Sequence, residues 1–172
     1  MNHRQIQEQL GGKMGLTLQN IIILFADSQV SNNYLQALLI HEYHHVCRLA
    51  CTNETEESIS LLESMIMEGL AEWAVYEELG SRYLASWTEK NDRRLTDESF
   101  MYLLLPRLQQ KGRENYYPFL FGDEKQGIPQ WLGYYFGYQL VRSAEKNLQK
   151  KTVELFNVSA ESIFEASRFT NS

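Results

Sequence analysis

The sequence lacks any long hydrophobic run, which excludes a membrane-spanning helix. Its longest unbroken apolar stretch is IIILFA at residues 21–26, whereas a transmembrane helix needs roughly 20 such residues. The opening residues, MNHRQIQEQLGG, contain no apolar core of a secretory signal peptide. We therefore expect no membrane association and a cytoplasmic location.

Cysteine and positive charge are also scarce. Cys47 and Cys51 stand one helical turn apart, which favours reduced, buried thiols over a disulfide framework and leaves metal binding by this pair as an alternative. The chain has 16 lysines and arginines against 22 acidic residues, 18 of them glutamate, so its net charge is -6. A chain without a basic surface is not expected to bind nucleic acid.

The length and the apolar content predict one folded domain. With 172 residues, 44% of them hydrophobic and only three prolines, the chain can bury a core of its own. We expect a single domain over residues 1–172, in which residues 1–15 form a short N-terminal lead.

The hydrophobic patterning predicts an α+β fold that is predominantly α-helical. A short N-terminal helix, a turn at GGKMG (11–15) and one strand in LTLQNIIILFA (16–26) are expected first. Helices are then expected at 33–51, 57–79, 97–111 (interrupted near Pro106), 130–149 and 158–167, with a loop over 112–130.

The predicted helix 33–51 carries three of the four histidines, in the stretch HEYHH. On a helical wheel His41, Glu42 and His45 fall within one arc, opposite an apolar side. Residues i and i+4 are neighbours, so His41 and His45 can present two imidazoles to one zinc ion, with Glu42 beside them to act on a water molecule. His44 lies off this arc and is interpreted as a bystander.

A chance H-E-x-x-H match in this composition has a probability of about one per cent, so the motif alone is only moderate evidence for a metal site. A third ligand elsewhere in the chain is needed to support it. The next predicted helix places Glu68 and Glu72 one turn apart within an apolar stripe. Buried carboxylates require a cation or hydrogen-bond donors. We therefore predict Glu68 as a zinc ligand and Glu72 as the acceptor of a ligand histidine's outer N–H group; the alternative is that both are solvated at a helix edge.

The combination of HEYHHVCRL and MEGLAEWAV resembles the gluzincin metallopeptidases, and specifically a family of predicted bacterial zinc-dependent proteases. The resemblance covers most of the chain from about residue 11, including IIILFA and GYYFGYQLV. It implies a zincin-like domain with a small β element next to the H-E-x-x-H helix. It also implies one Zn²⁺ held by His41, His45 and Glu68, with Glu42 as the catalytic glutamate and Glu72 supporting a ligand.

A third predicted helix, in WLGYYFGYQLVR (131–142), places Tyr134, Tyr138 and Arg142 at successive i+4 steps. A tyrosine hydroxyl or an arginine can stabilise the oxyanion that develops during peptide hydrolysis. We expect one of these three to do so, while core packing is an equally good interpretation of the tyrosines. Gly133 and Gly137 predict a close helix–helix contact on another side.

The leading hypothesis is a zinc peptidase that acts on a peptide or protein substrate, with Glu42 as general base. The strand expected near residues 20–26 would form the cleft rim and pair with the extended substrate. Two alternatives remain at this level: a non-catalytic zinc-binding regulatory or interaction domain on the same scaffold, and a helical structural domain without metal.

Overall fold

The computed structural model describes residues 11–18 and 21–170, so the expected N-terminal helix lies outside the described residues. The strands are β1 (Lys13–Leu18) and β2 (Ile21–Ala26), and the α-helices are α2 (Asn32–Thr52), α3 (Leu61–Leu79), α4 (Asp97–Ser99), α5 (Arg113–Phe121), α6 (Leu132–Leu148) and α7 (Ala160–Glu165). Short 3-10 or π turns connect them, at Ser81–Tyr83, Ser86–Thr88, Phe100–Leu104, Leu105–Arg107, Glu124–Gln126, Thr152–Glu154 and Arg168–Thr170. The mostly helical fold with a small β element is confirmed.

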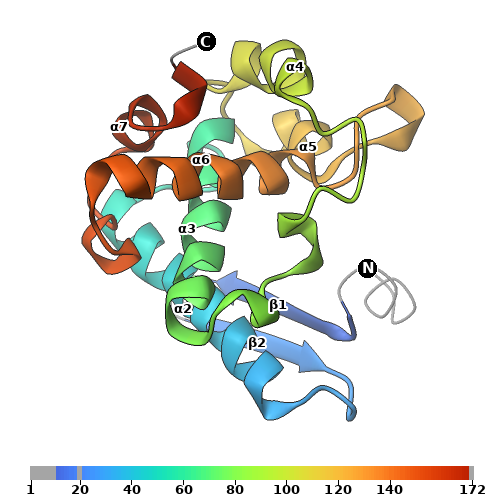
Figure 1. Ribbon diagram of the computed structural model, residues 1–172, viewed down its shortest axis with the longest axis vertical. Helices are drawn as coiled ribbons and strands as arrows, with labels where there is room; N and C mark the ends of the chain where they lie inside the picture. The colour runs from blue at the N-terminus through green and yellow to red at the C-terminus, as the bar shows by residue number, and fades with distance from the viewer. Residues whose placement is uncertain (1–10, 19–20, 171–172) are drawn as a thin grey trace.

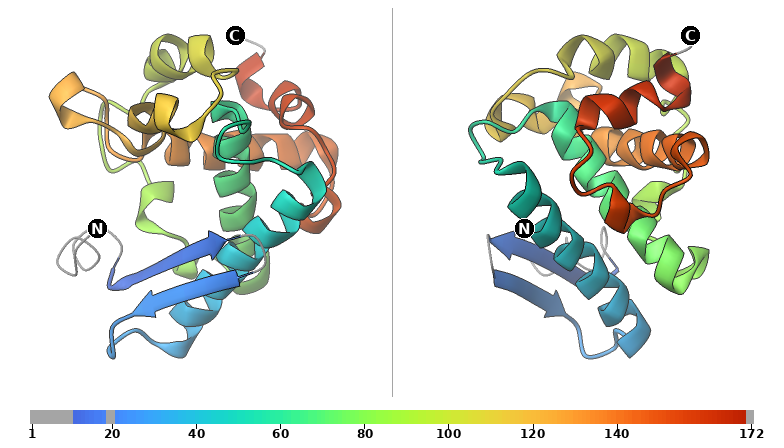
Figure 2. Two further views of the ribbon diagram at one scale, coloured as in Figure 1. Left: turned by 180° about the vertical axis from the view of Figure 1, so that it is seen from behind. Right: turned by 90° about the vertical axis from the view of Figure 1, so that its left-hand side faces the viewer.

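The larger elements stack in the order hairpin, α2, α3, α6 (Figures 1 and 2). The antiparallel hairpin β1–β2 lies across α2, α2 packs on α3, and α6 crosses α3 on the opposite side. The short helices α4, α5 and α7 gather at the end of the molecule away from the hairpin (Figure 1). No helix in the described part of the chain is long and apolar enough to cross a membrane.

Helix α3 forms the centre of the core. It begins after Ser60, whose hydroxyl accepts a hydrogen bond from the backbone N–H of Glu63 at 3.1 Å, a standard N-cap. Every residue from Leu61 to Val75 is buried. A helix buried on all sides must find partners for its charged side chains inside the protein, and this requirement shapes the site described below.

The crossing of α3 and α6 depends on glycine. A methyl group at Gly137 would overlap the carbonyl oxygen of Met65, and one at Gly69 would overlap the carbonyl oxygen of Gly137. Gly133 approaches α5 in the same way, because its Cβ would lie 2.8 Å from the Cα atom of Leu120. The close helix contact that the sequence predicted at Gly133 and Gly137 is therefore confirmed.

The hairpin corrects the prediction for the N-terminal part. The segment interpreted as a turn at 11–15 contributes to β1, which pairs with β2 from Lys13↔Ala26 to Leu18↔Ile21. The glycines mark the entry into the strand: Gly12 accepts a hydrogen bond from the backbone N–H of Asp27 at 2.9 Å. Among the residues that the structure describes, two strands and not one therefore precede α2.

The prediction of a loop over 112–130 was also wrong for the first half of that segment. Helix α5 occupies Arg113–Phe121 even though Pro118 lies inside it. Tyr116 anchors this helix to the core, where its hydroxyl lies 2.7 Å from the Ser64 hydroxyl and 3.2 Å from the Ile59 carbonyl oxygen. The tertiary anchor outweighs the cost of proline in so short a helix.

Candidate metal centre and active site

Helix α2 presents a cluster of possible metal ligands to a cleft. Ligand atoms of His41, Glu42 and His45 all lie within 4.8 Å of one another. The two imidazole rings stand edge to face with centroids 4.6 Å apart, as expected for residues one helical turn apart. Glu42 and His45 are buried, and the His41 side chain is 13% exposed.

The buried helix α3 brings Glu68 to the same point. Glu68 Oε2 lies 3.1 Å from His41 Nε2 and 3.4 Å from His45 Nε2. Zinc bonds of 2.0–2.1 Å in a tetrahedron place neighbouring donor atoms about 3.3 Å apart. Both separations are close to that edge length, so Glu68 lies where it could share a zinc ion with the two histidines.

Glu72, one turn further along α3, contacts the His41 ring nitrogen on the side away from Glu68. Its Oε2 atom lies 2.8 Å from His41 Nδ1, and its Oε1 atom accepts a short hydrogen bond from the backbone N–H of Ala85. Such a contact fixes the tautomer that leaves Nε2 as the metal-binding atom. His45 has no equivalent support: its Nδ1 atom is buried without a hydrogen-bond partner among the described residues.

The charges of this cluster are strongly coupled. Burial alone would lower the pKa of His41, but its hydrogen bonds to Glu68 and Glu72 outweigh burial and raise that pKa well above its ordinary value. Burial would raise the pKa of Glu68, but the positive charge of His45 and the hydrogen bonds from both histidines lower it. The buried carboxylates therefore favour a positive charge at this point, which a protonated imidazole or a metal ion can supply.

The hairpin contacts the Glu42 side chain directly. Thr17 on β1 donates from its hydroxyl to Glu42 Oε2 at 2.7 Å, and the same hydroxyl lies 3.0 Å from the Glu42 carbonyl oxygen. Gly15 on the same strand leaves room for the carboxylate, because a methyl group at this position would overlap it. Sequence reasoning missed Thr17 and Gly15, since nothing in their neighbourhood marks a contact with a residue 25 positions away.

The ligand cluster opens into a cleft of about 1370 Å³ that extends from β1 to the start of α5. Four side chains form its aromatic wall, with Tyr134 at the centre: the ring centroids of Trp87, Phe121 and Trp131 lie 5.2, 5.3 and 5.0 Å from that of Tyr134. Trp131 adopts a left-handed backbone conformation, φ 60°, which is strained for a bulky residue. The chain turns at this residue and enters α6 beside the cleft.

Of the three residues predicted on α6, only Tyr134 lines the cleft. Burial first, and then the negative charge of Glu68, raise the pKa of Tyr134 well above its ordinary value, so its hydroxyl stays protonated. Tyr138 instead packs against Trp73, with ring centroids 5.7 Å apart, and Arg142 is exposed to solvent. Neither Tyr138 nor Arg142 is among the residues that line this cleft.

Other side chains of α2 face away from the cleft. His44 is buried against Phe156, at 4.5 Å between centroids, and burial lowers its pKa to about 3; it is a core residue, in keeping with its interpretation as a bystander. The two cysteines are free thiols as expected, but Cys51 is exposed and Cys47 only half-buried, so the expected burial was wrong.

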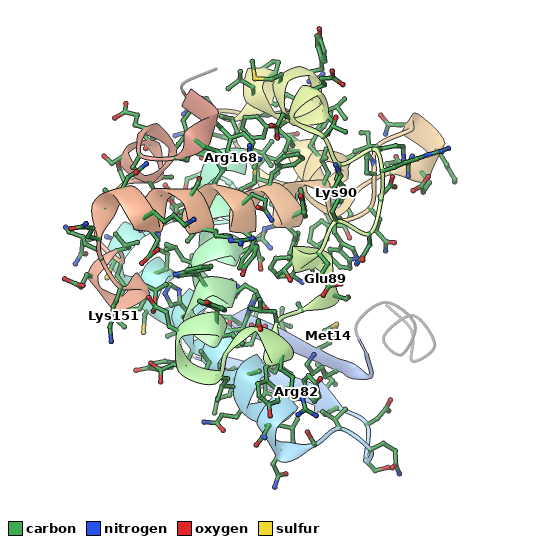
Figure 3. The ribbon with its side chains drawn as sticks, in the orientation of Figure 1. Met14, Arg82, Glu89, Lys90, Lys151 and Arg168 are labelled. Carbon is green, nitrogen blue, oxygen red and sulfur yellow. The ribbon has the colours of Figure 1, made fainter. Side chains whose placement is uncertain are left out.

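Arg113, at the start of α5, also lines the cleft and was not predicted. Its segment was expected to be a loop, and a single arginine in a loop carries no signal for a site. Figure 3 shows the many charged side chains at the surface, among which sequence alone does not distinguish one that turns inward.

Comparisons with known proteins agree with this geometry. Residues 1–165 match the family described as predicted Zn-dependent protease, DUF2268. The uncharacterized protein YjaZ of Bacillus subtilis (strain 168) is 34% identical over 165 residues, which cover 95% of this chain and 62% of YjaZ. The uncharacterized protein YjfC of the same organism is 27% identical over 120 residues, 63% of this chain and 39% of YjfC.

The chain thus spans less than two thirds of the length of either relative. No solved structure matches the chain significantly. The family match nevertheless extends over α2, α3 and the hairpin that contacts Glu42. This chain belongs to the family of predicted zinc-dependent proteases.

Proposed function

We propose that the protein is a zinc-dependent peptidase of the gluzincin type, in which His41, His45 and Glu68 hold one zinc ion. The observation that carries this proposal is the position of Glu68 Oε2, 3.1 and 3.4 Å from the Nε2 atoms of the two histidines. When bound, zinc supplies a Lewis acid that polarises the substrate carbonyl and makes water more acidic.

Glu42 acts as the general base in this proposal. Thr17 occupies its Oε2 atom, which leaves Oε1 to take a proton from the attacking water molecule and to deliver it to the leaving amine. Because the hairpin fixes Glu42 through Thr17 and Gly15, the base is oriented before the substrate arrives, which reduces the cost of reaching the reactive geometry.

Tyr134 is the proposed donor to the oxyanion. It lines the cleft beside Glu68 and stays protonated, because burial and the Glu68 charge raise its pKa. A neutral hydroxyl that is already positioned can donate a hydrogen bond to the oxygen on which negative charge develops. Placing this role on Tyr134 alone narrows the three candidates of the sequence to one.

The substrate is proposed to be a peptide or protein that lies along β1. The sequence analysis assigned the cleft rim to the strand near 20–26, but residues of β1 line the cleft throughout and β2 contributes only Ile21 among the described residues. In the described part of the chain β1 pairs with β2 alone. Its second edge can therefore hydrogen-bond an extended peptide.

The Glu42→Gln variant tests this proposal. Zinc content, measured by elemental analysis, is expected to stay at one ion per chain, because Glu42 is not a proposed ligand. Hydrolysis of a peptide library is expected to fall at least about 100-fold, the usual minimum for loss of a general base. Glu78→Gln is the matched control, since Glu78 is exposed on α3 and should leave both measurements unchanged.

Other outcomes would point to other functions. Unchanged hydrolysis in Glu42→Gln would contradict the assignment of the base. Stoichiometric zinc without hydrolysis in the wild type would favour a non-catalytic zinc-binding domain, and absence of zinc after gentle purification would favour a structural domain.

A further inference from the structure

Arg113 gives the cleft a positive charge on the side of α5, and this inference rests on the proposed peptidase function. Its backbone N–H donates to the carbonyl oxygen of Glu56 at 2.9 Å, so the start of α5 is fixed to the loop after α2. Its side chain is 27% exposed and lines the same cleft as the ligand cluster and the aromatic wall.

The guanidinium group of Arg113 is incompletely satisfied. Its Nε atom is buried and has no hydrogen-bond partner among the described residues. The carboxylate that pairs with it, Glu56 Oε2, lies 3.4 Å from Nε on a side chain that is 71% exposed. Such an exposed pair contributes little, whereas a buried polar atom without a partner is costly, so the site is suited to receive an anion.

The ligand cluster does not supply the missing hydrogen-bond partner of Arg113. Burial would lower the pKa of Arg113, but the negative charge of Glu68 first, and then that of Glu56, raise it. Arg113 and Glu68 line the same cleft, so the charge of Glu68 acts on Arg113 across it. Glu68, however, already contacts His41 and His45, and its charge would be used by a bound zinc ion. In the zinc-loaded protein Arg113 would remain a cation in the cleft where the proposed peptide substrate lies.

We propose that Arg113 binds a carboxylate group of the substrate and so determines which peptides are cleaved. The planar guanidinium fork matches a carboxylate in a bidentate arrangement. Tyr134 and the rest of the aromatic wall, on the same side of the cleft, would hold an apolar side chain next to that carboxylate. The carboxylate can come from the C-terminus of a peptide or from an aspartate or glutamate side chain.

Lys13 is the matched control, because it is a second cation that lines the same cleft. It stands on β1, with its Nζ atom 5.3 Å from the ring centroid of Tyr34. If any positive charge in the cleft sufficed, Lys13→Gln and Arg113→Gln would have equal effects. Arg168, at the far end of the molecule from the hairpin (Figure 3), is the distant control.

The first experiment measures binding to the metal-free protein, so that a carboxylate cannot simply coordinate zinc. The probes are N-acetylphenylalanine and its amide, and the readout is the fluorescence of Trp87 and Trp131, which line the cleft. The acid is expected to bind roughly 10- to 100-fold more tightly than the amide, the range of a charge-assisted hydrogen bond. Arg113→Gln is expected to abolish this preference, whereas Lys13→Gln and Arg168→Gln retain it.

The Glu56→Gln variant tests the direction of the change in affinity for the acid. It removes the carboxylate that competes for Arg113, so binding of the acid is expected to tighten and not to weaken. Equal affinity of acid and amide in the wild type, including no binding of either, would overturn the proposal. A preference that survives in Arg113→Gln would overturn it as well.

The second experiment identifies the source of the carboxylate with the zinc-loaded protein. Randomised octapeptides with free or amidated C-termini are digested, and the products are identified by mass spectrometry. Preference for free C-termini would identify the terminal carboxylate, and enrichment of Asp and Glu at one fixed position would identify a side chain. Cleavage without either preference contradicts the inference alone. Absence of all cleavage contradicts the peptidase function, and the binding experiment then still decides the role of Arg113.

Discussion

Two buried carboxylates on α3, five residues apart, pair with bases on α2 in opposite ways. Glu63 receives two hydrogen bonds from the fully buried Arg48, from Nε at 2.7 Å and from Nη2 at 2.8 Å. The remaining nitrogen of Arg48 donates to the carbonyl oxygens of Leu155, Phe156 and Val158 at 2.7–3.0 Å. Glu68 instead faces two histidines at 3.1 and 3.4 Å and opens into the cleft.

The difference separates a structural charge pair from a binding site. The pair of Arg48 and Glu63 is closed: its geometry is bidentate, and it holds the segment after α6 against α2. The group around Glu68 is spaced for an ion between its members. Burial and charge are alike in the two places, so the distances and the access to the cleft distinguish them. Variants on the two sides should therefore fail in different ways.

The largest expected effect is on stability, in Arg48→Met. Removing one partner of a buried pair leaves an uncompensated charge and costs about 3–5 kcal/mol. For a chain of this size that lowers Tm by roughly 6–20 °C, measured by circular dichroism. Zinc bound by the folded fraction is expected to stay at one ion per chain.

The double variant Arg48→Met/Glu63→Met is the control, since it removes both charges and should recover part of the loss. If Arg48→Met melts like the wild type, the pair of Arg48 and Glu63 is not structural. If the single variant does not fold, the milder Glu63→Gln gives the same comparison.

The next effect is on zinc affinity, in Glu68→Gln and Glu72→Gln. Loss of a contact behind a ligand histidine costs about 10- to 100-fold in affinity, which we expect for Glu72→Gln, and Glu68→Gln should cost more because it removes a ligand. Zinc at 100 times its dissociation constant stabilises the wild type by about 2.7 kcal/mol, and this gain should vanish in Glu68→Gln. Competition with a chelating dye measures the affinities; equal losses in the two variants would contradict the assigned roles.

The smallest expected effect concerns Thr17. This residue contacts the proposed general base Glu42, but it contacts no proposed metal ligand and is not part of the core. Thr17→Val removes the hydroxyl that donates to Glu42 Oε2 while keeping the shape of the side chain. We expect kcat to fall roughly tenfold, by analogy with the weaker charged hydrogen bonds, with zinc content and Tm unchanged. Thr17→Ser keeps the hydroxyl and should retain most of the activity.

The part of the site that sequence analysis predicted lies on two long helices. A helix fixes which residues share a face. The spacing of His41 and His45, and that of Glu68 and Glu72, therefore predicts that each pair lies on one face of its helix. Helices expected at 33–51 and 57–79 are found at Asn32–Thr52 and Leu61–Leu79. The expected burial of the apolar side of α2 was wrong, because Leu39 and Tyr43 are exposed. Apart from Ala37, the buried residues of this helix are polar or charged: Glu42, His44, His45 and Arg48.

The parts that were missed depend on contacts between distant segments. The second half of β1 fell within the expected strand 16–26, whereas its first half is recognisable only through pairing with β2, because Gly11, Gly12 and Gly15 favour a turn there. Helix α5 contains Pro118 and is held by Tyr116 in the core. Thr17 and Arg113 acquire their positions from these two elements, so no local pattern could have indicated them.

The glycine contact between α3 and α6 has a consequence for movement during catalysis. Gly69 follows the ligand Glu68 directly, and the Gly137 backbone against which it rests lies one turn after Tyr134. With no side chain between the two backbones, these helices cannot slide without collision, so Glu68 and Tyr134 are expected to move together as one half of the cleft. Adjustment to substrates of different size would then fall to the opposite half, where the hairpin β1–β2 lies on the surface of α2.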